Sequence, residues 1–452
     1  MKRAGLLKSI LIGTVALLGG CSEGAPGRAA LSEIKPVAFV RGLAGGTAHP
    51  DSAEHTNAPS LSSAGHDASS DIIDGLLARR TVLSSKSPYA PVADTMLKTS
   101  SGLAQAELRA SKMRSVARSK NWLPTIGPSI TLSSLGELAA GLIVDQVLYD
   151  NGKRKAERAF AAADVEVSAV ALSQDMNDRL HAGLTLFITA AQAREKAGMA
   201  ERGLGRMQEF NRVVSVRVSG GLSSLSDQRV VRAKLTDMDQ EASTHREVER
   251  ASLSEFAAMT NGHSVTPLTS AHAISLPSTT LKPLDVLRAE AEAKRSVAEA
   301  KAARAGLLPS LSAGGILGQK NSASATLGGT ANLGVGTGAE MEALKAQERA
   351  AAARVTLAKE TAARKSARLQ NELTALVRQE RDTADLVQQN RTNFRLFQEQ
   401  FEGGQKTVMD VVAVYEQMVR SELKHIDQKY DIILTQLEMA RLAGSLANGA
   451  DI

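Results

Sequence analysis

Apolar residues recur at helical spacing through most of the chain after residue 100. The clearest run extends from Val408 to Leu437, where apolar positions follow one another at intervals of three or four. Two consecutive intervals of four form a stutter, which locally unwinds a left-handed supercoil. The pattern predicts a long, nearly straight helix that packs along other helices. Its apolar positions are Val408, Val412, Tyr415, Val419, Leu423, Ile426, Tyr430, Ile433 and Leu437.

The same order of patterns occurs twice along the chain. A helical segment is predicted over residues 90–121 and ends at Leu123-Pro124, and its counterpart over residues 284–305 ends at Leu308-Pro309. A proline after an apolar residue ends a helix and favours extended backbone before it. Two short extended stretches are expected after each Leu-Pro, over 125–132 and 138–149 in the first copy and over 310–317 and 323–333 in the second.

Each pair of extended stretches leads into a very long helical run. The two runs cover residues 152–218 and 339–402, which corresponds to roughly 100 Å each at 1.5 Å per residue. Helices of this length are typical of coiled-coil packing. Leu369, Leu373, Leu376, Phe394, Phe397 and Phe401 mark the apolar positions of the second run.

Paired glycines interrupt the helical sequence after each long run. These are Gly220-Gly221 and Gly403-Gly404, and an acid follows each pair at the same distance, Asp227 and Asp410. Return helices are expected after each pair, over residues 226–260 in the first copy. Each copy is therefore a helix, two strands, a long helix, a glycine reversal and a return helix.

The four predicted strands leave two sheet edges unpaired in a single chain. Alternation of apolar and polar residues is partial, and Pro128 argues against a central place in a closed sheet. Four strands do not close a barrel, whereas three chains would supply twelve. A barrel shared between chains pairs every edge, which a membrane requires.

The first twenty residues have the pattern of a secretory signal, with Lys2 and Arg3 before an apolar core. The core ends in Leu18-Gly19-Gly20-Cys21, which resembles the bacterial lipobox. That resemblance implies that Cys21 becomes the lipid-modified N-terminus, and Ser22 after it implies sorting to the outer membrane. Several buried acyl chains anchor a protein stably where one would be marginal. The alternative is an ordinary signal peptide with an incidental cysteine.

The predicted organisation has six parts. They are a lipoprotein signal peptide (1–20), a flexible lipid-anchored tether rich in small and polar residues (21–70), the first repeat (71–262), a connector (263–283), the second repeat (284–445) and a C-terminal tail (446–452).

Composition narrows the possible functions. The 452 residues are 43% hydrophobic and only 3% aromatic, few aromatics for one compact core. The net charge of +6 falls to about half when the leader is removed, and the remaining charges alternate in sign, which is typical of solvated helix faces and not of a nucleic-acid-binding surface. One cysteine excludes internal disulfides and a cysteine-based zinc site.

No motif indicates an enzyme. The sequence lacks HExxH, P-loop and nucleophile-elbow patterns. His49, His55 and His66 lie at irregular intervals in the tether, so neither a metal nor a cofactor is expected beyond the lipid. The glycines between 328 and 338 lack the Rossmann spacing and indicate a glycine-rich strand.

Over about residues 105–445 the chain resembles the TolC-like outer-membrane efflux family. The features that carry this resemblance are the two Leu-Pro pairs, the segment Gln146 to Gly152, the segment Gly221 to Asp227, and the segment Phe401 to Val412 with its continuation from Tyr430 to Gly444.

The resemblance implies a mainly α fold with a small β part. A homotrimer would build one twelve-stranded outer-membrane barrel and a tunnel of coiled-coil hairpins across the periplasm. Gly220, Gly221, Gly403 and Gly404 would form the periplasmic tips that meet an adaptor protein. The connector and the tail would form a belt around the tunnel.

Two groups of residues match functional positions of the family. Asp410 matches an acidic ring at the constriction, and the second acid common in the family is replaced by Ala413. Lys406, Ser226 and Asp227 match a closure network, with lysine in place of the usual arginine and Phe401 in place of a tyrosine. Lysine lacks the planar fork of arginine, so the resemblance implies a gate held by fewer directed bonds. The alternative is ordinary surface charge near a helix turn.

The functional hypothesis is a passive outer-membrane duct. It would work with a periplasmic adaptor (membrane-fusion) protein and an inner-membrane transporter, and small-molecule efflux is favoured because a lipid anchor is common in that branch. The alternatives are the outer-membrane component of a type I protein secretion system and a non-channel, lipid-anchored periplasmic coiled coil.

Overall fold

The computed structural model describes residues 70–451, apart from 101, 133–137, 264, 266, 267, 269, 278–280, 319–322 and 331–333. All of the described residues belong to one compact unit, Pro59–Ile452. The predicted signal peptide, Cys21 and nearly all of the predicted tether lie outside the described residues.

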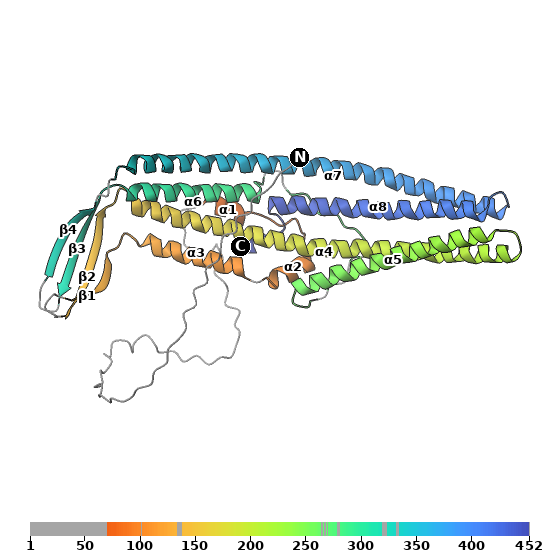
Figure 1. Cartoon of the computed structure of the whole chain (residues 1–452), viewed down its shortest axis with the longest axis horizontal. Helices are drawn as coiled ribbons and strands as arrows, with labels where there is room; N and C mark the ends of the chain where they lie inside the picture. The colour runs from red at the N-terminus through yellow and green to blue at the C-terminus, as the bar shows by residue number, and fades with distance from the viewer. Residues whose placement is uncertain are drawn as a thin grey trace, which may run out of the picture. The chain divides into compact units, whose positions relative to one another are not determined.

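The chain is mainly helical with one small sheet, as the sequence predicts (Figure 1). The first half contains α1 (Asp71–Leu77), α2 (Ala90–Lys98), α3 (Leu103–Ser119), β1 (Thr125–Leu132), β2 (Leu138–Tyr149), α4 (Lys153–Ser219) and α5 (Leu225–Met259). The second half contains α6 (Leu284–Gly306), β3 (Ser310–Gly318), β4 (Ala323–Thr330), α7 (Thr337–Glu402), α8 (Val408–Ala443) and a short 3-10 helix (Gly449–Asp451).

The predicted continuous helix over residues 90–121 is wrong in one respect, because the structure divides it into α2 and α3. Gly102 precedes α3 with a left-handed φ of 68°, which a helix interior does not accommodate. Helix α1 and the 3-10 helix were not predicted, since each is too short to show a period.

The four strands form one antiparallel sheet in the order β1-β2-β3-β4. Their predicted starts are confirmed, and only the last three positions of the fourth prediction lie outside the described residues. Strands β1 and β4 are the two edges of this sheet, and among the described residues neither has a partner on its outer side.

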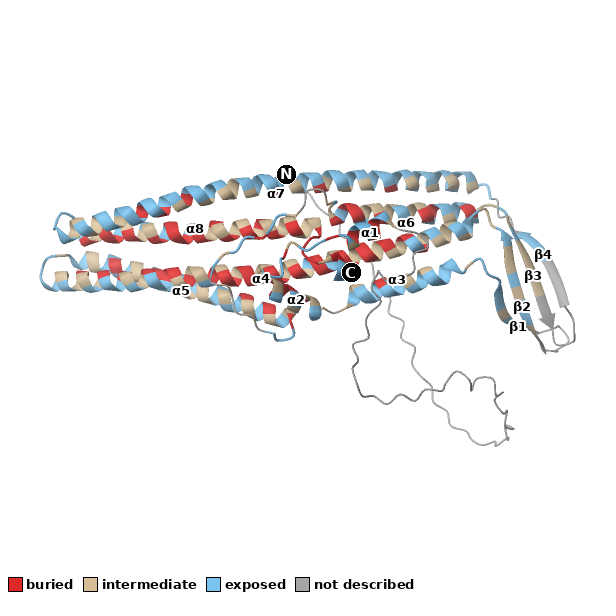
Figure 2. Cartoon of the chain, turned by 180° about the vertical axis from the view of Figure 1, so that it is seen from behind, coloured by how far each residue is buried: buried red, intermediate tan, exposed pale blue. Residues whose placement is uncertain are grey.

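Two helical hairpins, α4–α5 and α7–α8, carry most of the packing. Helix α4 packs against α1, α2, α3, α5, α6 and α8, whereas α7 packs against α6 and α8. Buried residues concentrate on α4 and α8, and α7 is mostly exposed (Figure 2). Every one of the apolar positions predicted from Val408 to Leu437 is buried.

The C-terminal tail lies against the segment that follows α1. The backbone N–H of Val82 donates to the carbonyl of Ser445 over 2.8 Å, and that of Gly449 donates to the carbonyl of Arg79 over 3.0 Å. The buried guanidinium of Arg79 donates to the carbonyls of Ala443 and Lys282, so it joins the end of α8 to the connector. Both segments expected in a belt thus meet near the first helix.

Within the described ranges, no helix contains a stretch that is long and apolar enough to cross a membrane.

Candidate functional site

The first glycine pair closes the α4–α5 turn. Gly221 has a φ of 73°, and its N–H donates to the carbonyl of Val218 over 3.0 Å. The N–H of Leu222 donates to the carbonyl of Arg217 over 2.7 Å. These two bonds form a Schellman motif, which ends a helix at a residue in the left-handed conformation that glycine adopts at least cost.

The second glycine pair builds the same motif at the α7–α8 turn. Gly404 has a φ of 76° and donates to the carbonyl of Phe401 over 3.0 Å, and Gln405 donates to the carbonyl of Gln400 over 2.8 Å. All four predicted glycines therefore lie in helix–helix turns, and the two turns share one backbone design.

The acids that follow the glycine pairs cap the return helices. The hydroxyl of Ser224 accepts from the N–H of Asp227 over 3.2 Å, and the Asp227 carboxylate accepts from the N–H of Ser224 over 3.1 Å. Thr407 and Asp410 form the same reciprocal pair at 3.2 and 2.9 Å. This capping box satisfies N–H groups that the first turn of a helix leaves without partners. The equal spacing of the two acids thus has a structural cause.

The residue Asp410 is partly exposed, and its carboxylate is negatively charged at neutral pH. The backbone N–H and the hydroxyl of Thr407 both donate to it, and together with the nearby Lys406 they lower the pKa of Asp410. The cap therefore orients the carboxylate and keeps it ionised, both of which a constriction ring would need.

The predicted gate lysine lies over an aromatic ring of its own hairpin. The Lys406 ammonium is 5.0 Å from the centre of the Phe397 ring, and the guanidinium of Arg217 is 5.7 Å from the centre of the Phe401 ring. Both distances are within the range of cation–π attraction. Phe401 therefore contacts a cation of the other hairpin through the face of its ring.

The other predicted gate residues stay on the first hairpin. The Ser226 hydroxyl is 2.6 Å from that of Ser224, and Asp227 is engaged in its capping box. Among the described residues of one chain, Lys406 forms no ion pair with Asp227. The closure network remains a prediction, and within one chain these residues are held by local bonds.

Sequence reasoning missed the capping roles of Ser224 and Thr407 and the cation–π contacts of Arg217 and Phe397. The capping roles of Ser224 and Thr407 could have been predicted, since a serine or threonine three residues before an acid is the signature of a capping box. The cation–π contacts could not have been predicted, because they join residues from different turns of the helices.

The sheet register separates apolar and polar residues far more fully than the sequence pattern did. Cross-strand partners share a face of a sheet, and neighbours along a strand alternate between faces. One face pairs Ile126 with Val144, Pro128 with Leu142, and Ala313 with Leu327. The opposite face pairs Thr125 with Asp145, Asp145 with Gly314, and Ser312 with Gly328. One face is apolar, and the other consists mostly of polar residues and glycine.

The end of the sheet next to the helices carries the aromatic residues. A register shift between Val147 and Tyr149 pairs Tyr149 with Leu311, which moves the tyrosine onto the apolar face. Trp122 is 61% exposed and Tyr149 is 60% exposed. Gln146, the polar exception on the apolar face, donates to the carbonyl of Trp122 over 2.9 Å. Trp122 and Tyr149 thus lie at one end of the sheet.

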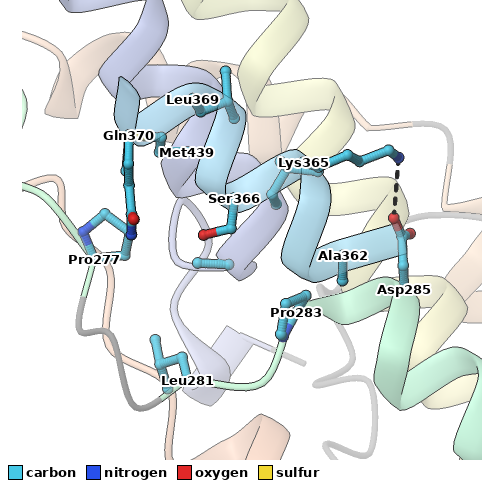
Figure 3. A pocket seen from close by; sticks show the side chains of 12 residues that line it. Pro277, Leu281, Pro283, Asp285, Ala362, Lys365, Ser366, Leu369, Gln370 and Met439 are labelled. Carbon is cyan, nitrogen blue, oxygen red and sulfur yellow. Dashed lines mark ion pairs between the residues drawn. The ribbon is translucent and has the colours of Figure 1, made fainter. Parts of the chain in front are cut away.

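A small cavity of about 120 Å³ lies between the connector, α7 and the end of α8 (Figure 3). An ion pair of 3.6 Å between Lys365 and Asp285 closes one side of it. Ligand pockets usually measure roughly 300–1,000 Å³, a range that includes a wider hollow of about 710 Å³ between α1, the connector, α6 and α7. No predicted site residue lines this cavity, and the described residues contain no cluster of three or more metal-ligating side chains.

The fold matches solved outer-membrane channels. The outer membrane protein VceC of Vibrio cholerae aligns with a TM-score of 0.71 at 14% identity, over 79% of this chain and 97% of that one. The CmeC outer membrane channel of Campylobacter jejuni aligns at 0.67 and 14%, over 79% and 86%. The open MtrE outer membrane channel of Neisseria gonorrhoeae aligns at 0.67 and 15%, over 79% and 89%.

No protein-family model matches the sequence, and no curated protein sequence does. At these identities the likeness establishes the fold alone, and that fold is the one of TolC-like outer-membrane channels. CmeC and MtrE are described as channels and not as enzymes.

Proposed function

We propose that this protein is a passive duct through the outer membrane, formed by three copies of the chain. The observation that carries the proposal is the four-stranded sheet, which has one apolar face and two edges without partners. A spanning sheet must satisfy every backbone group in lipid, so its edges must be paired. Strand β1 of one copy would pair with β4 of the next, and the apolar face would contact lipid.

The strand lengths suit this arrangement. The strands contain 8, 12, 9 and 8 residues, close to the roughly 9–11 residues that a tilted transmembrane strand needs. Trp122 and Tyr149 would occupy the interface on the periplasmic side, where aromatic residues are enriched in such barrels. Pro128 lies on β1 and cannot donate a ladder hydrogen bond, so it counts against a barrel in which β1 has a partner on both sides.

The long helices would continue the duct across the periplasm. Helices α4 and α7 contain 67 and 66 residues, about 100 Å each. Their far turns, with Gly220, Gly221, Gly403 and Gly404, would meet a periplasmic adaptor protein that joins the duct to an inner-membrane transporter. Lipid on Cys21 would anchor each copy to the outer membrane.

The turns would also form the gate. Three copies of Asp410 around an axis make a negative ring that favours cations and resists anions. Lys406 of the same hairpin would reach Ser226 and Asp227 of a neighbouring copy in the closed state. With Phe401 in contact with Arg217, the gate would have few directed bonds.

Engineered cysteines test the shared sheet directly. Within a chain, β1 and β4 are separated by two strands, so at about 4.8 Å per strand they lie beyond the reach of a disulfide. Gly127→Cys is combined in turn with Thr326→Cys, Gly328→Cys and Thr330→Cys. Covalent dimers and trimers on oxidation, absent from each single variant, would support pairing of β1 with β4 between copies. Monomers alone in all three combinations would overturn it.

Conductance in planar bilayers separates a duct from a lipid-anchored coiled coil. The duct should conduct, with a preference for cations that Asp410→Asn weakens, and should migrate as a heat-modifiable trimer on gels. Lys406→Ala should raise the open fraction, and no change in conductance would contradict its role in the gate. A protein that binds membranes through its lipid and never conducts would be the coiled coil.

For the cargo, we favour small molecules because a predicted lipid anchor accompanies this fold. The alternative is polypeptide export as part of a type I system. Crosslinking from cysteines placed at 221–227 and 404–410 would identify the adaptor and with it the class of transporter. Loss of resistance to toxic compounds on deletion would support efflux, whereas loss of a secreted polypeptide would support the alternative.

A further inference from the structure

The helix ends that border the sheet carry a group of exposed cations. Because the strands are antiparallel in chain order, the start of β1, the end of β2 and the start of β3 lie at the same edge of the sheet. Helices α3, α4 and α6 end or begin at that edge (Figure 1). We name the following residues of these helix ends the cationic collar: Lys120, Lys153, Lys155, Lys301 and Arg304.

The collar residues are not used by the fold. All are exposed, and within the described residues none forms an ion pair. Of the nearby acids, Asp150 accepts from the N–H groups of Gly152 and Arg154, and Glu157 accepts from Asn121, whereas Glu299 is exposed and forms no ion pair among the described residues. The fourth helix end, at the start of α7, carries Glu340 and Glu342 instead, so the positive charge is confined to three of the four ends.

Two of the collar lysines are placed unfavourably for the stability of the helix that carries them. Lys153 and Lys155 lie in the first turn of α4, which contains no acid. The positive end of the helix dipole disfavours cations at that place. Lys120 and Arg304 lie at helix C-termini, where the dipole favours them. Helix stability therefore explains the cations of α3 and α6 and not those of α4.

The collar lies next to the surface that would meet lipid. It adjoins the aromatic end of the apolar face, where Trp122, Leu148 and Tyr149 are exposed. We propose that the cationic collar binds the phosphodiester headgroups of anionic phospholipids in the periplasmic leaflet of the outer membrane. The proposal rests on the proposed function, which places the sheet in that membrane. Long lysine and arginine stems lie along apolar surface while their charged ends reach the headgroups.

Lipid selectivity tests the collar. The full-length protein is reconstituted into phosphatidylcholine vesicles that contain a trace of spin-labelled phosphatidylglycerol or spin-labelled phosphatidylcholine, and the motionally restricted fraction is compared. At low salt we expect the phosphatidylglycerol probe to associate about threefold more strongly, and high salt should reduce the ratio. Replacing all five collar residues with glutamine should bring it close to one.

A matched variant removes the same charge away from the sheet. It carries glutamine at five exposed residues in the rest of the helices that form no ion pair among the described residues: Arg212, Arg232, Arg368, Arg378 and Arg395. This variant should keep the selectivity of the wild type. Equal selectivity in the wild type and the collar variant, or an equal loss in both variants, would overturn the collar.

The same vesicles separate this proposal from the proposed function. If the wild type inserts and conducts without selecting phosphatidylglycerol, the duct stands and the collar fails. If it neither inserts nor conducts, both fail, because the collar then meets no leaflet.

Discussion

The two helical hairpins have the same turn motif, but they differ in which of their helices is buried. In α4–α5 the long helix is the buried one, with roughly a third of its residues buried, and the return helix α5 is mostly exposed. In α7–α8 the order is reversed: fewer than one residue in ten of α7 is buried, and α8 carries the core. The repeated sequence pattern thus specifies each helix and its turn. How far a helix is buried depends on the neighbouring helices against which it packs.

Helix α4 is covered by its neighbours because glycines let those helices approach it closely. A Cβ atom at Gly183 would lie 2.6 Å from the Met96 side chain, and one at Gly203 would lie 3.0 Å from that of Met238. The missing side chains let α2 and α5 approach α4. Helix α7 leaves Leu357, Leu386 and Leu396 exposed in a single chain. In the proposed trimer, a neighbouring copy would cover that surface.

Matched leucines in the two long helices give the largest expected difference. Leu184 in α4 is completely buried, and Leu357 in α7 is 59% exposed. Leu184→Ala should lower the free energy of unfolding by about 2–5 kcal/mol through the lost burial and the cavity. Leu357→Ala should change it by less than about 0.5 kcal/mol in the dissociated chain. Urea unfolding in detergent, followed by circular dichroism, measures both. Equal losses would show that α7 is covered by its own chain.

The glycines before and after α8 differ in the space around them. Gly444 has a φ of 62°, and a Cβ there would lie 2.5 Å from Leu284, whereas Gly404 has a φ of 76° and open space around it. Gly444→Ala should cost about 2–3 kcal/mol, from the left-handed backbone and the overlap. Gly404→Ala should cost only about 1 kcal/mol. Thermal unfolding of both variants checks the order, and a larger loss at Gly404 would contradict it.

The capping boxes should respond alike, since the two turns share their geometry. Ser224→Ala and Thr407→Ala should each weaken the start of a return helix by about 1 kcal/mol. Hydrogen exchange of amides in the first turns of α5 and α8 is the suitable measurement, because the effect is local. Ser223→Ala, next to the first cap and outside both boxes, serves as the control. Faster exchange at only one turn would show that the hairpins differ at their turns as well.

Acid stability tests the contact between α4 and α8. Burial alone would raise the pKa of Glu438, but hydrogen bonds from Arg441 and His181 outweigh it and lower the pKa to about 2. A carboxyl with a lowered pKa stabilises the fold above its ordinary value of 4.5, and that contribution is lost as the pH falls toward 2. Glu438→Gln should flatten unfolding free energy against pH in this window. An unchanged slope would contradict the assignment.

The regular parts of the fold followed from the sequence. The stutter run from Val408 to Leu437 predicted a buried helix face, and the glycine pairs predicted both reversals, because period and turn chemistry are local properties. The break at Gly102 was not predicted, because a single glycine within a helical pattern does not reveal whether its φ is left-handed. The apolar sheet face was only partly visible, because glycine-rich strands fix their register through partners far along the chain.

The candidate site was likewise only partly predictable from the sequence. The positions of the glycines and the capping acids could be predicted, whereas the contacts of Lys406 and Phe401 with aromatic and cationic partners required the packed hairpins. The acidic ring, the closure network and the lipid on Cys21 depend on copies and modifications outside a single chain, so they remain predictions.

The contact between the segment after α8 and the segment after α1 has a consequence for when this region can fold. Ser445, Leu446 and Gly449 bond to Val82, Thr81 and Arg79, and Thr81 and Leu446 lie 365 residues apart in the sequence. These hydrogen bonds therefore form only after both repeats have been synthesised. Removing the residues after Gly444 would leave Thr81 and Val82 without these partners, whereas the guanidinium of Arg79 would keep its bond to Ala443.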